Sequence, residues 1–212
     1  MRKILQHIMQ REVPLMLIII LLLVVSCKKE EPQTNPASTQ VLNSSSSESV
    51  FVEVKKKLKE KPDDAEALYH LADIYDRNEQ YVEAIDTYKK VIAIKPTMGY
   101  AYFKMGTAYD RINQPDEAVK SFKKAIELMP ENAVAYNNLG VAYGKLRMFD
   151  NEIAALKKAI KIRSNYSSAR YNLGMTYIKT GNKKAALKEY ESLKKLDEGA
   201  AESLLQEINR TS

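Results

Sequence analysis

Apolar and small residues recur with a period of 34 residues between positions 65 and 200. In the first half of each period, an apolar residue, a small residue and a tyrosine occur at helical spacing. These residues are Leu71, Ala72 and Tyr75; Met105, Gly106 and Tyr109; Leu139, Gly140 and Tyr143; and Leu173, Gly174 and Tyr177. The second half has its own apolar stripe, in which Tyr88 corresponds to Phe122, Leu156 and Tyr190. The pattern predicts two amphipathic helices in each of four units, which span residues 65–98, 99–132, 133–166 and 167–200.

Residues that favour turns separate the two helices of a unit. They are Asn78 in the first unit, Asn113, Gln114 and Pro115 in the second, and Gly181 and Asn182 in the fourth. Pro115 suits the first position of a helix, because a backbone N–H has no partner there. Before the first unit, Asp63 is the expected N-cap, and Glu66 three residues later would complete a capping box.

Shorter amphipathic segments flank the four units. Residues 48–64 predict a half-repeat helix whose apolar stripe consists of Val50, Phe51, Val54 and Leu58. Residues 201–212 predict a capping helix and tail, with an apolar stripe that consists of Ala200, Leu204, Leu205 and Ile208. A stack of repeats needs such ends, because its terminal units otherwise expose an apolar face. A helix that docks on a partner is the alternative for the last segment.

The period, the small residues and the tyrosines resemble the tetratricopeptide repeat, a helix-turn-helix unit of 34 residues. The resemblance implies an all-α fold: a right-handed superhelical solenoid of antiparallel helix pairs, with four repeats, a leading half-repeat and a C-terminal capping helix. Glu152 departs from the pattern, since the other units have alanine there, and we expect its carboxylate to reach solvent near the positive start of its helix. Arg170 stands where the other units have Leu68, Tyr102 and Tyr136, and we do not expect it to pair with Glu152.

The N-terminal segment has the composition of a secretory signal. Basic residues at Arg2, Lys3 and Arg11 precede an apolar run over residues 13–25, as in a leader that is removed after export. A helix of that length would span about 20 Å, which is short of the roughly 30 Å hydrocarbon core of a bilayer. A signal peptide over residues 1–26 is therefore favoured over a membrane-spanning helix.

The single cysteine of the chain, Cys27, directly follows this segment. Residues Val24, Val25, Ser26 and Cys27 resemble the bacterial lipobox, which implies cleavage before the cysteine and attachment of diacylglycerol and palmitate to it. Two or three acyl chains would hold the protein stably at a membrane. The alternative is an ordinary secretory leader with an incidental cysteine. One cysteine also excludes an internal disulfide framework.

Residues 27–47 contain too few apolar residues to form a core. They include a run of serines and several charged residues and prolines, so we predict a disordered tether after the lipidated cysteine. The formal net charge of +6 falls to +4 once the leader is removed, because three basic residues and one acidic residue leave with it.

Lysine pairs recur with the same period in the second helix of the first three units. They are Lys89 and Lys90, Lys123 and Lys124, and Lys157 and Lys158. We interpret them as a solvated convex face, while attraction to anionic lipid or nucleic acid is the alternative. Export argues against nucleic acid, and no aromatic residues interleave with the pairs. We therefore predict no nucleic-acid partner.

The sequence has no recognisable catalytic set. Once the leader is removed, His70 is the one histidine that remains, and the mature chain has no free cysteine. The chain can therefore form neither a Cys–His catalytic pair nor the usual set of zinc ligands. No glycine-rich phosphate-binding motif occurs. We therefore predict no enzyme activity, no metal, no cofactor and no small-molecule substrate.

In tetratricopeptide repeat proteins, fixed positions of the first helix face a peptide in the concave groove. By position, the resemblance implies a groove lined by Tyr69, Asp73, Tyr100, Phe103, Asn137, Asn138, Val141, Tyr171, Asn172 and Met175. Asn138 and Asn172 occupy the position where family members use an amide to bind a peptide backbone, since an amide both donates and accepts. The carboxylate clamp of chaperone-binding members is absent. We expect an extended ligand with apolar and basic side chains.

Together these features predict a membrane-anchored lipoprotein of the bacterial cell envelope, on the periplasmic face or at the cell surface. Its repeats are expected to act as a noncatalytic scaffold that binds an extended peptide or a partner helix in the concave groove. The alternative is a self-assembling structural protein of the envelope that associates through its convex face or its C-terminal helix.

Overall fold

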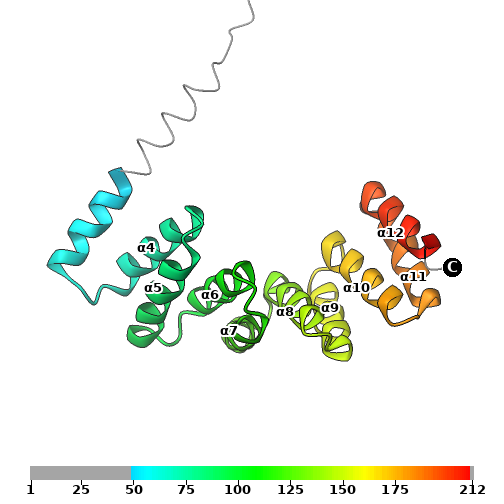
Figure 1. The fold of residues 1–212 in the computed structure, drawn as a ribbon, viewed down its shortest axis with the longest axis horizontal. Helices are drawn as coiled ribbons and strands as arrows, with labels where there is room; N and C mark the ends of the chain where they lie inside the picture. Colours follow the sequence, from blue (N-terminus) through cyan, green and yellow to red (C-terminus); the bar gives the residue numbers. More distant parts are fainter. Residues whose placement is uncertain (1–48, 211–212) are drawn as a thin grey trace, which may run out of the picture. The chain divides into compact units, whose positions relative to one another are not determined.

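The computed structural model describes residues 49–210, and every regular element in this range is a helix (Figure 1). A helix over 49–60 comes first and four helix pairs follow. The pairs are α4 (Ala65–Arg77) and α5 (Tyr81–Ile94), α6 (Gly99–Arg111) and α7 (Pro115–Leu128), α8 (Ala133–Lys145) and α9 (Phe149–Ile162), and α10 (Ser167–Lys179) and α11 (Lys183–Leu193). The last helix is α12 (Glu198–Arg210). The predicted all-α solenoid of helix pairs is confirmed.

The predictions for the N-terminal segment concern residues that the structure does not describe. The leader over 1–26, the lipid anchor at Cys27 and the tether over 27–47 all lie outside the described range. Among the helices of residues 49–210, none has the length and apolar character needed to cross a membrane.

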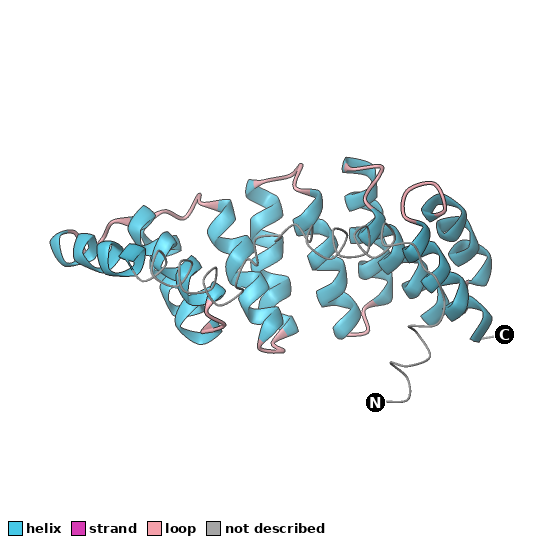
Figure 2. Ribbon diagram, turned by 90° about the horizontal axis from the view of Figure 1, so that it is seen from above, coloured by secondary structure: helices cyan, strands magenta, loops and turns pink. Residues whose placement is uncertain are grey.

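The helix pairs pack in sequence order. We call α4, α6, α8 and α10 the A helices, and α5, α7, α9 and α11 the B helices. Each A helix packs against the B helix of its own pair, and each B helix packs against the helix that follows it. Successive A helices also contact one another, whereas successive B helices in the described range do not. The connecting loops lie alternately along two edges of the array (Figure 2). The A helices therefore form a continuous surface, which we call the groove face.

Small residues allow the two helices of a pair to approach closely. A Cβ atom on Gly106 of α6 would lie 2.8 Å from the ring of Phe122 in α7, and one on Gly140 of α8 would lie 2.8 Å from Leu156 Cγ in α9. Phe122 and Leu156 are both fully buried. A larger side chain at either glycine would overpack the contact.

The loop inside each pair contains one residue in the left-handed region of backbone space. These residues are Glu79, Asn113, Arg147 and Gly181, with φ values of 60°, 57°, 59° and 74°. They share the period of the repeats. In the first pair, the sequence predicted the turn at Asn78, one residue before the left-handed position. In the third pair, Arg147 carries no turn preference of its own, so its conformation is imposed by the repeat.

The N-cap of α4 differs from the prediction by one residue. The side chain of Asp64 accepts hydrogen bonds from the backbone N–H groups of Glu66 and Ala67, at 3.1 and 3.0 Å. Asp64 has an extended backbone and precedes the first helical residue. The prediction of Asp63 as the N-cap is therefore wrong, because the helix begins one residue later than the capping-box spacing indicated.

Both ends of the described range cover the repeats. Leu204 of α12 is fully buried and lies against Gly174 of α10. At the other end, the ring of Phe51 packs edge-to-face on Tyr75 of α4, with ring centroids 6.0 Å apart. The helix over 49–60 and α12 thus both pack on the terminal units.

Candidate functional site

Three cavities follow one another along the groove face. The first, of about 610 Å³, lies beside α6 and α8 and includes Arg163 at its edge. The second, of about 220 Å³, lies between α8 and α10. The third, of about 290 Å³, lies between α10 and α12. Six of the predicted groove residues line these cavities: Tyr100 and Phe103 in the first, Val141 and Met175 in the second, Tyr171 in the third, and Asn172 in the second and third.

The aromatic residues of the groove face differ in burial. Tyr100 is 61% exposed and lines the first cavity. Tyr69 and Phe103 are half-buried, and their rings lie 5.8 Å from the ring of Tyr88 and 6.0 Å from that of Phe122. Truncation of Tyr69 or Phe103 would therefore remove core contacts as well as groove surface. Tyr100 can be changed without this effect.

The acidic residues of α4 are neutralised within the protein. Asp73 pairs with Arg77 at 2.6 Å and with Lys104 of the next A helix at 2.8 Å. Lys104 Nζ also lies 3.5 Å from Asp76 Oδ2. The predicted groove residue Asp73 thus joins α4 to α6, and the charge that it offers to a ligand is reduced.

The asparagines of the groove face form a chain of hydrogen bonds across two repeats. Asn172 Nδ2 donates to Asn137 Oδ1 at 3.0 Å, and Asn137 Nδ2 donates to Asn138 Oδ1 at 3.1 Å. Asn137 is only 7% exposed. Asn137 therefore positions its two neighbours, while Asn138 and Asn172 are half-buried and reach the groove face.

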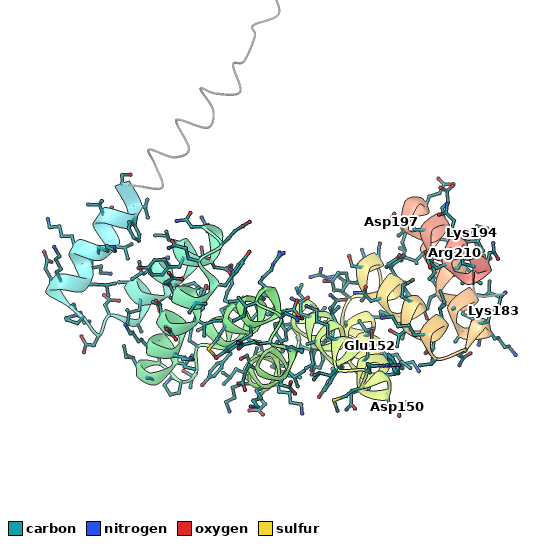
Figure 3. The ribbon with its side chains drawn as sticks, in the orientation of Figure 1. Asp150, Glu152, Lys183, Lys194, Asp197 and Arg210 are labelled. Atoms are coloured by element: carbon teal, nitrogen blue, oxygen red, sulfur yellow. The ribbon has the colours of Figure 1, made fainter. Side chains whose placement is uncertain are left out.

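Glu152 of α9 is buried, with 4% of its surface exposed. Its Oε2 atom has no hydrogen-bond partner within the described residues. Burial raises the pKa of the Glu152 carboxyl, and the Thr176 hydroxyl and the Lys179 ammonium oppose that rise. The expectation that this carboxylate reaches solvent is wrong, because α10 of the following repeat packs over the start of α9. In Figure 3, Glu152 lies among the helices, whereas Asp150 lies at their outer edge.

The sequence contained a partial indication of this site. Glu152 replaces an alanine that is fully buried in the first two repeats, Ala84 and Ala118. At the facing position, Gly144 provides the room for a longer side chain, since a Cβ atom there would lie 2.7 Å from Glu152 Oε1. Position 152 could therefore have been assigned to the core. That the carboxylate meets a cavity could not be predicted.

The lysine pairs of the B helices contact tyrosines of neighbouring helices. Lys123 lies 5.7 Å from the ring centre of Tyr143, and Lys157 lies 5.8 Å from that of Tyr177. Each lysine belongs to a B helix and each tyrosine to the next A helix. The rings come from positions 20 residues after the lysines, so these contacts are formed by the fold and not by aromatic residues interleaved with the pairs. Such contacts stabilise the solenoid.

Comparison with known families agrees with this architecture. Models of the tetratricopeptide repeat match residues 65–98, 133–166 and 167–199, and a model described as a TPR repeat matches residues 111–146. With the paired helices and the groove face, these matches define the class of protein. The chain belongs to the tetratricopeptide repeat family. No curated protein matches the sequence significantly.

Several solved structures share the fold. A crystal structure of MamA has a TM-score of 0.68 and 28% identity, over 72% of this chain and 89% of MamA. YrrB, described as a TPR protein with an unusual peptide-binding site, has a TM-score of 0.69 and 22% identity, over 79% of this chain and 88% of YrrB. The first TPR of Spaghetti (RPAP3), solved with the HSP90 peptide SRMEEVD, has a TM-score of 0.54 and 21% identity, over 55% and 93%. At these identities the last two structures show a common fold.

Proposed function

We propose that this protein is a noncatalytic protein-interaction scaffold of the bacterial cell envelope, held at a membrane by lipid on Cys27. Its groove face binds an extended peptide or a partner helix. The observation that carries this proposal is the succession of three cavities along the A helices. They cover two consecutive junctions between helix pairs and the junction between the fourth pair and α12. An elongated ligand can contact all three, whereas a compact small molecule would occupy one.

The side chains of the groove face suit a polypeptide. Tyr100 offers an exposed aromatic surface, and aromatic residues supply much of the affinity at protein interfaces. Asn138 and Asn172 are held in place through Asn137, and an amide can both donate to and accept from a peptide backbone. The combination of apolar pockets with fixed amides supports capture of an extended segment.

The remaining chemistry supports a noncatalytic role. Within residues 49–210, no group of three or more histidine, cysteine, aspartate or glutamate residues is arranged to hold a metal ion. Among the described carboxylates, Asp73 of the groove face pairs with Arg77 and Lys104, and Glu152 at the second cavity is buried. YrrB and the RPAP3 domain, which share the fold, are described as a protein with a peptide-binding site and as a peptide complex.

The alternative of self-assembly through the C-terminal helix has less support. The apolar residues Ala201, Leu204 and Ile208 of α12 are buried, because α12 packs on α10 and α11. An assembly through this helix would have to use its polar side. Light scattering of a fragment over residues 48–212 tests this alternative. Self-assembly predicts a dimer or a larger species, and a monomer would contradict it.

Crosslinking in intact cells tests the proposed function. A photoreactive amino acid at Tyr100 should form a covalent adduct with a partner protein. The same amino acid at Lys90, an exposed residue of the B helix α5, is the matched control and should form none. Adducts at Lys90 alone, or equal adducts at both positions, would place binding away from the groove face.

A further inference from the structure

The cavity between α8 and α10 has a buried acid at its base. Its walls include Val141 of α8 and Met175 of α10, both half-buried, and Glu152 of α9 contributes the carboxylate. Val141 and Met175 are residues that the sequence placed in the groove. This cavity of about 220 Å³ therefore joins apolar walls to an ionisable group.

Gly144 makes room for that carboxylate at the wall of the cavity. A Cβ atom at residue 144 would lie 2.7 Å from Glu152 Oε1 and 2.9 Å from Glu152 Oε2, distances at which a side chain cannot fit. The Glu152 carboxylate therefore packs directly on Gly144, in the space that a side chain at residue 144 would need. No side chain of α8 at this position separates Glu152 from the groove face.

One oxygen of the carboxylate, Oε2, lacks a hydrogen-bond donor within the described residues. Glu152 is 4% exposed, and its Oε2 atom accepts no hydrogen bond within the described residues. The nearby Thr176 hydroxyl already donates to the backbone carbonyl of Asn172 at 2.8 Å. A buried carboxylate oxygen without a donor is costly for a folded protein, and a ligand that brings a donor would remove that cost.

The lysines at the edge of the cavity do not make it an anion site. Lys145 is paired with Asp110, since its Nζ lies 2.6 Å from Asp110 Oδ1. Lys179 is exposed. The charges of Asp110, Lys145, Glu152 and Lys179 sum to zero. Asp110 pairs with Lys145, whereas no ion pair joins Glu152 to another of the described residues.

We propose that this cavity binds a lysine or arginine side chain of the polypeptide that occupies the groove face. The aliphatic stem of the ligand lies along Val141 and Met175, as long basic side chains do on apolar surfaces. Its cationic head donates to the Glu152 carboxylate and forms a charge-assisted hydrogen bond. Asn172 lines the same cavity, and the carbonyl oxygen of its side-chain amide serves as a second acceptor. This inference rests on the proposed function and specifies the side chain that the groove selects.

Peptide pools of defined charge test the inference on the full chain in detergent micelles. Each pool consists of capped nine-residue peptides with uncharged, randomised flanks and one fixed central residue: lysine, arginine, norleucine or glutamate. Fluorescence anisotropy gives the apparent Kd of each pool. We expect the lysine and arginine pools to bind about tenfold tighter than the norleucine pool, which corresponds to one charge-assisted hydrogen bond, and the glutamate pool to bind most weakly.

Variants assign the preference to the cavity. In Glu152→Gln, the ratio between the cationic pools and the norleucine pool should fall to about one. Asp150→Asn removes the same charge from an exposed position of α9 and should leave the ratio unchanged. Gly144→Ala should also reduce the ratio, with thermal melting as the check on folding. Lys179→Gln removes a competing cation and should increase the ratio.

The possible failures are distinguishable. If every pool binds but the cationic preference is absent, or persists in Glu152→Gln, the cavity does not select basic side chains and the peptide-binding function stands. If the glutamate pool binds best and Glu152→Gln strengthens it further, the lysines of the edge define an anion site and the inference is overturned. If none of the pools binds, both the inference and the proposed peptide-binding function fail.

Discussion

Leu204 of α12 packs directly on Gly174 of α10: a Cβ atom at residue 174 would lie 2.5 Å from Leu204 Cδ2. In the second and third pairs, the equivalent glycine faces a large residue of its own B helix. In the fourth pair it faces the helix that follows, so α12 completes the core of the last repeat.

We predict that Leu204→Ala destabilises the protein by about 2–5 kcal/mol, because it leaves a cavity against a glycine that cannot fill it. Leu205→Ala, at the half-buried neighbouring position, is the control and should have a much smaller effect. Urea unfolding measures both. Similar losses for the two variants would show that α12 does not complete the core through Leu204.

The pH dependence of stability should change in Glu152→Gln. Burial raises the pKa of this carboxyl in the folded state above its ordinary value of 4.5. The folded protein therefore holds the proton more tightly than the unfolded chain, and the contribution of Glu152 to the free energy of unfolding falls as pH rises above that ordinary value. The variant should gain stability relative to the natural protein between pH 4.5 and 8.

Urea unfolding of both proteins across this pH range measures the difference. Thr176 and Lys179 oppose the rise in the pKa of Glu152, and Lys145 lines the same cavity, so these side chains remain unchanged in the comparison. Asp150→Asn is the exposed control. A stability difference that is independent of pH would contradict the burial of Glu152.

Two loops contain a residue with a strained backbone conformation, and replacement by glycine should relieve this strain. Glu79 and Arg147 have φ values of 60° and 59°, a conformation that glycine adopts without penalty. Glu79→Gly and Arg147→Gly should therefore each stabilise the protein by roughly 1 kcal/mol. Lys90→Gly, at an exposed position inside α5, should instead destabilise it by about 1 kcal/mol. Thermal unfolding that shows a loss at all three positions would refute the prediction.

The ion pair between Arg170 and Glu189 should be stronger than those at the surface. Their side chains are 18% and 16% exposed, and Arg170 Nη1 lies 3.0 Å from Glu189 Oε2. A double-mutant cycle should give a coupling free energy of about 1–2 kcal/mol, above the few tenths expected for the exposed pair of Lys120 and Glu117. Equal coupling in the two cycles would mean that burial adds nothing to the first pair.

The lipid anchor can be tested by metabolic labelling. In a bacterial host that attaches lipid to lipoproteins, the natural chain should incorporate labelled palmitate, and Cys27→Ser should not, because the acceptor sulfur is gone. Ser26→Ala keeps a small residue before the cysteine and should still be labelled. A natural chain that remains unlabelled in such a host would exclude the anchor.

The periodic part of the fold could be predicted because each helix pair buries a stripe that is visible in the sequence. Gly106 with Phe122 and Gly140 with Leu156 illustrate this, since the partners lie within one repeat. Contacts between different repeats were harder to predict from the sequence. The cation–π contact between Lys123 and Tyr143 joins a B helix to the next A helix. No pattern of neighbouring residues in the sequence predicts this contact.

The least predictable feature was the environment of Glu152. A glutamate near the start of a helix is ordinarily solvated, and its burial depends on Gly144 and on the packing of α10 in the next repeat. Asn137, Asn138 and Asn172 were all predicted from the sequence to face a peptide in the groove. The structure gives Asn137 a supporting role, since it is 7% exposed.

The hydrogen-bond chain through Asn137 has a mechanical consequence. A ligand that pulls the amide of Asn172 must displace Asn137 as well, and with it the carbonyl oxygen of Asn138 in the preceding A helix. If the groove face binds a polypeptide as proposed, these hydrogen bonds would couple occupancy of the third repeat to occupancy of the fourth. A two-part ligand that engages one of them would find the other already adjusted, so the pair behaves as a single recognition unit rather than as two separate ones.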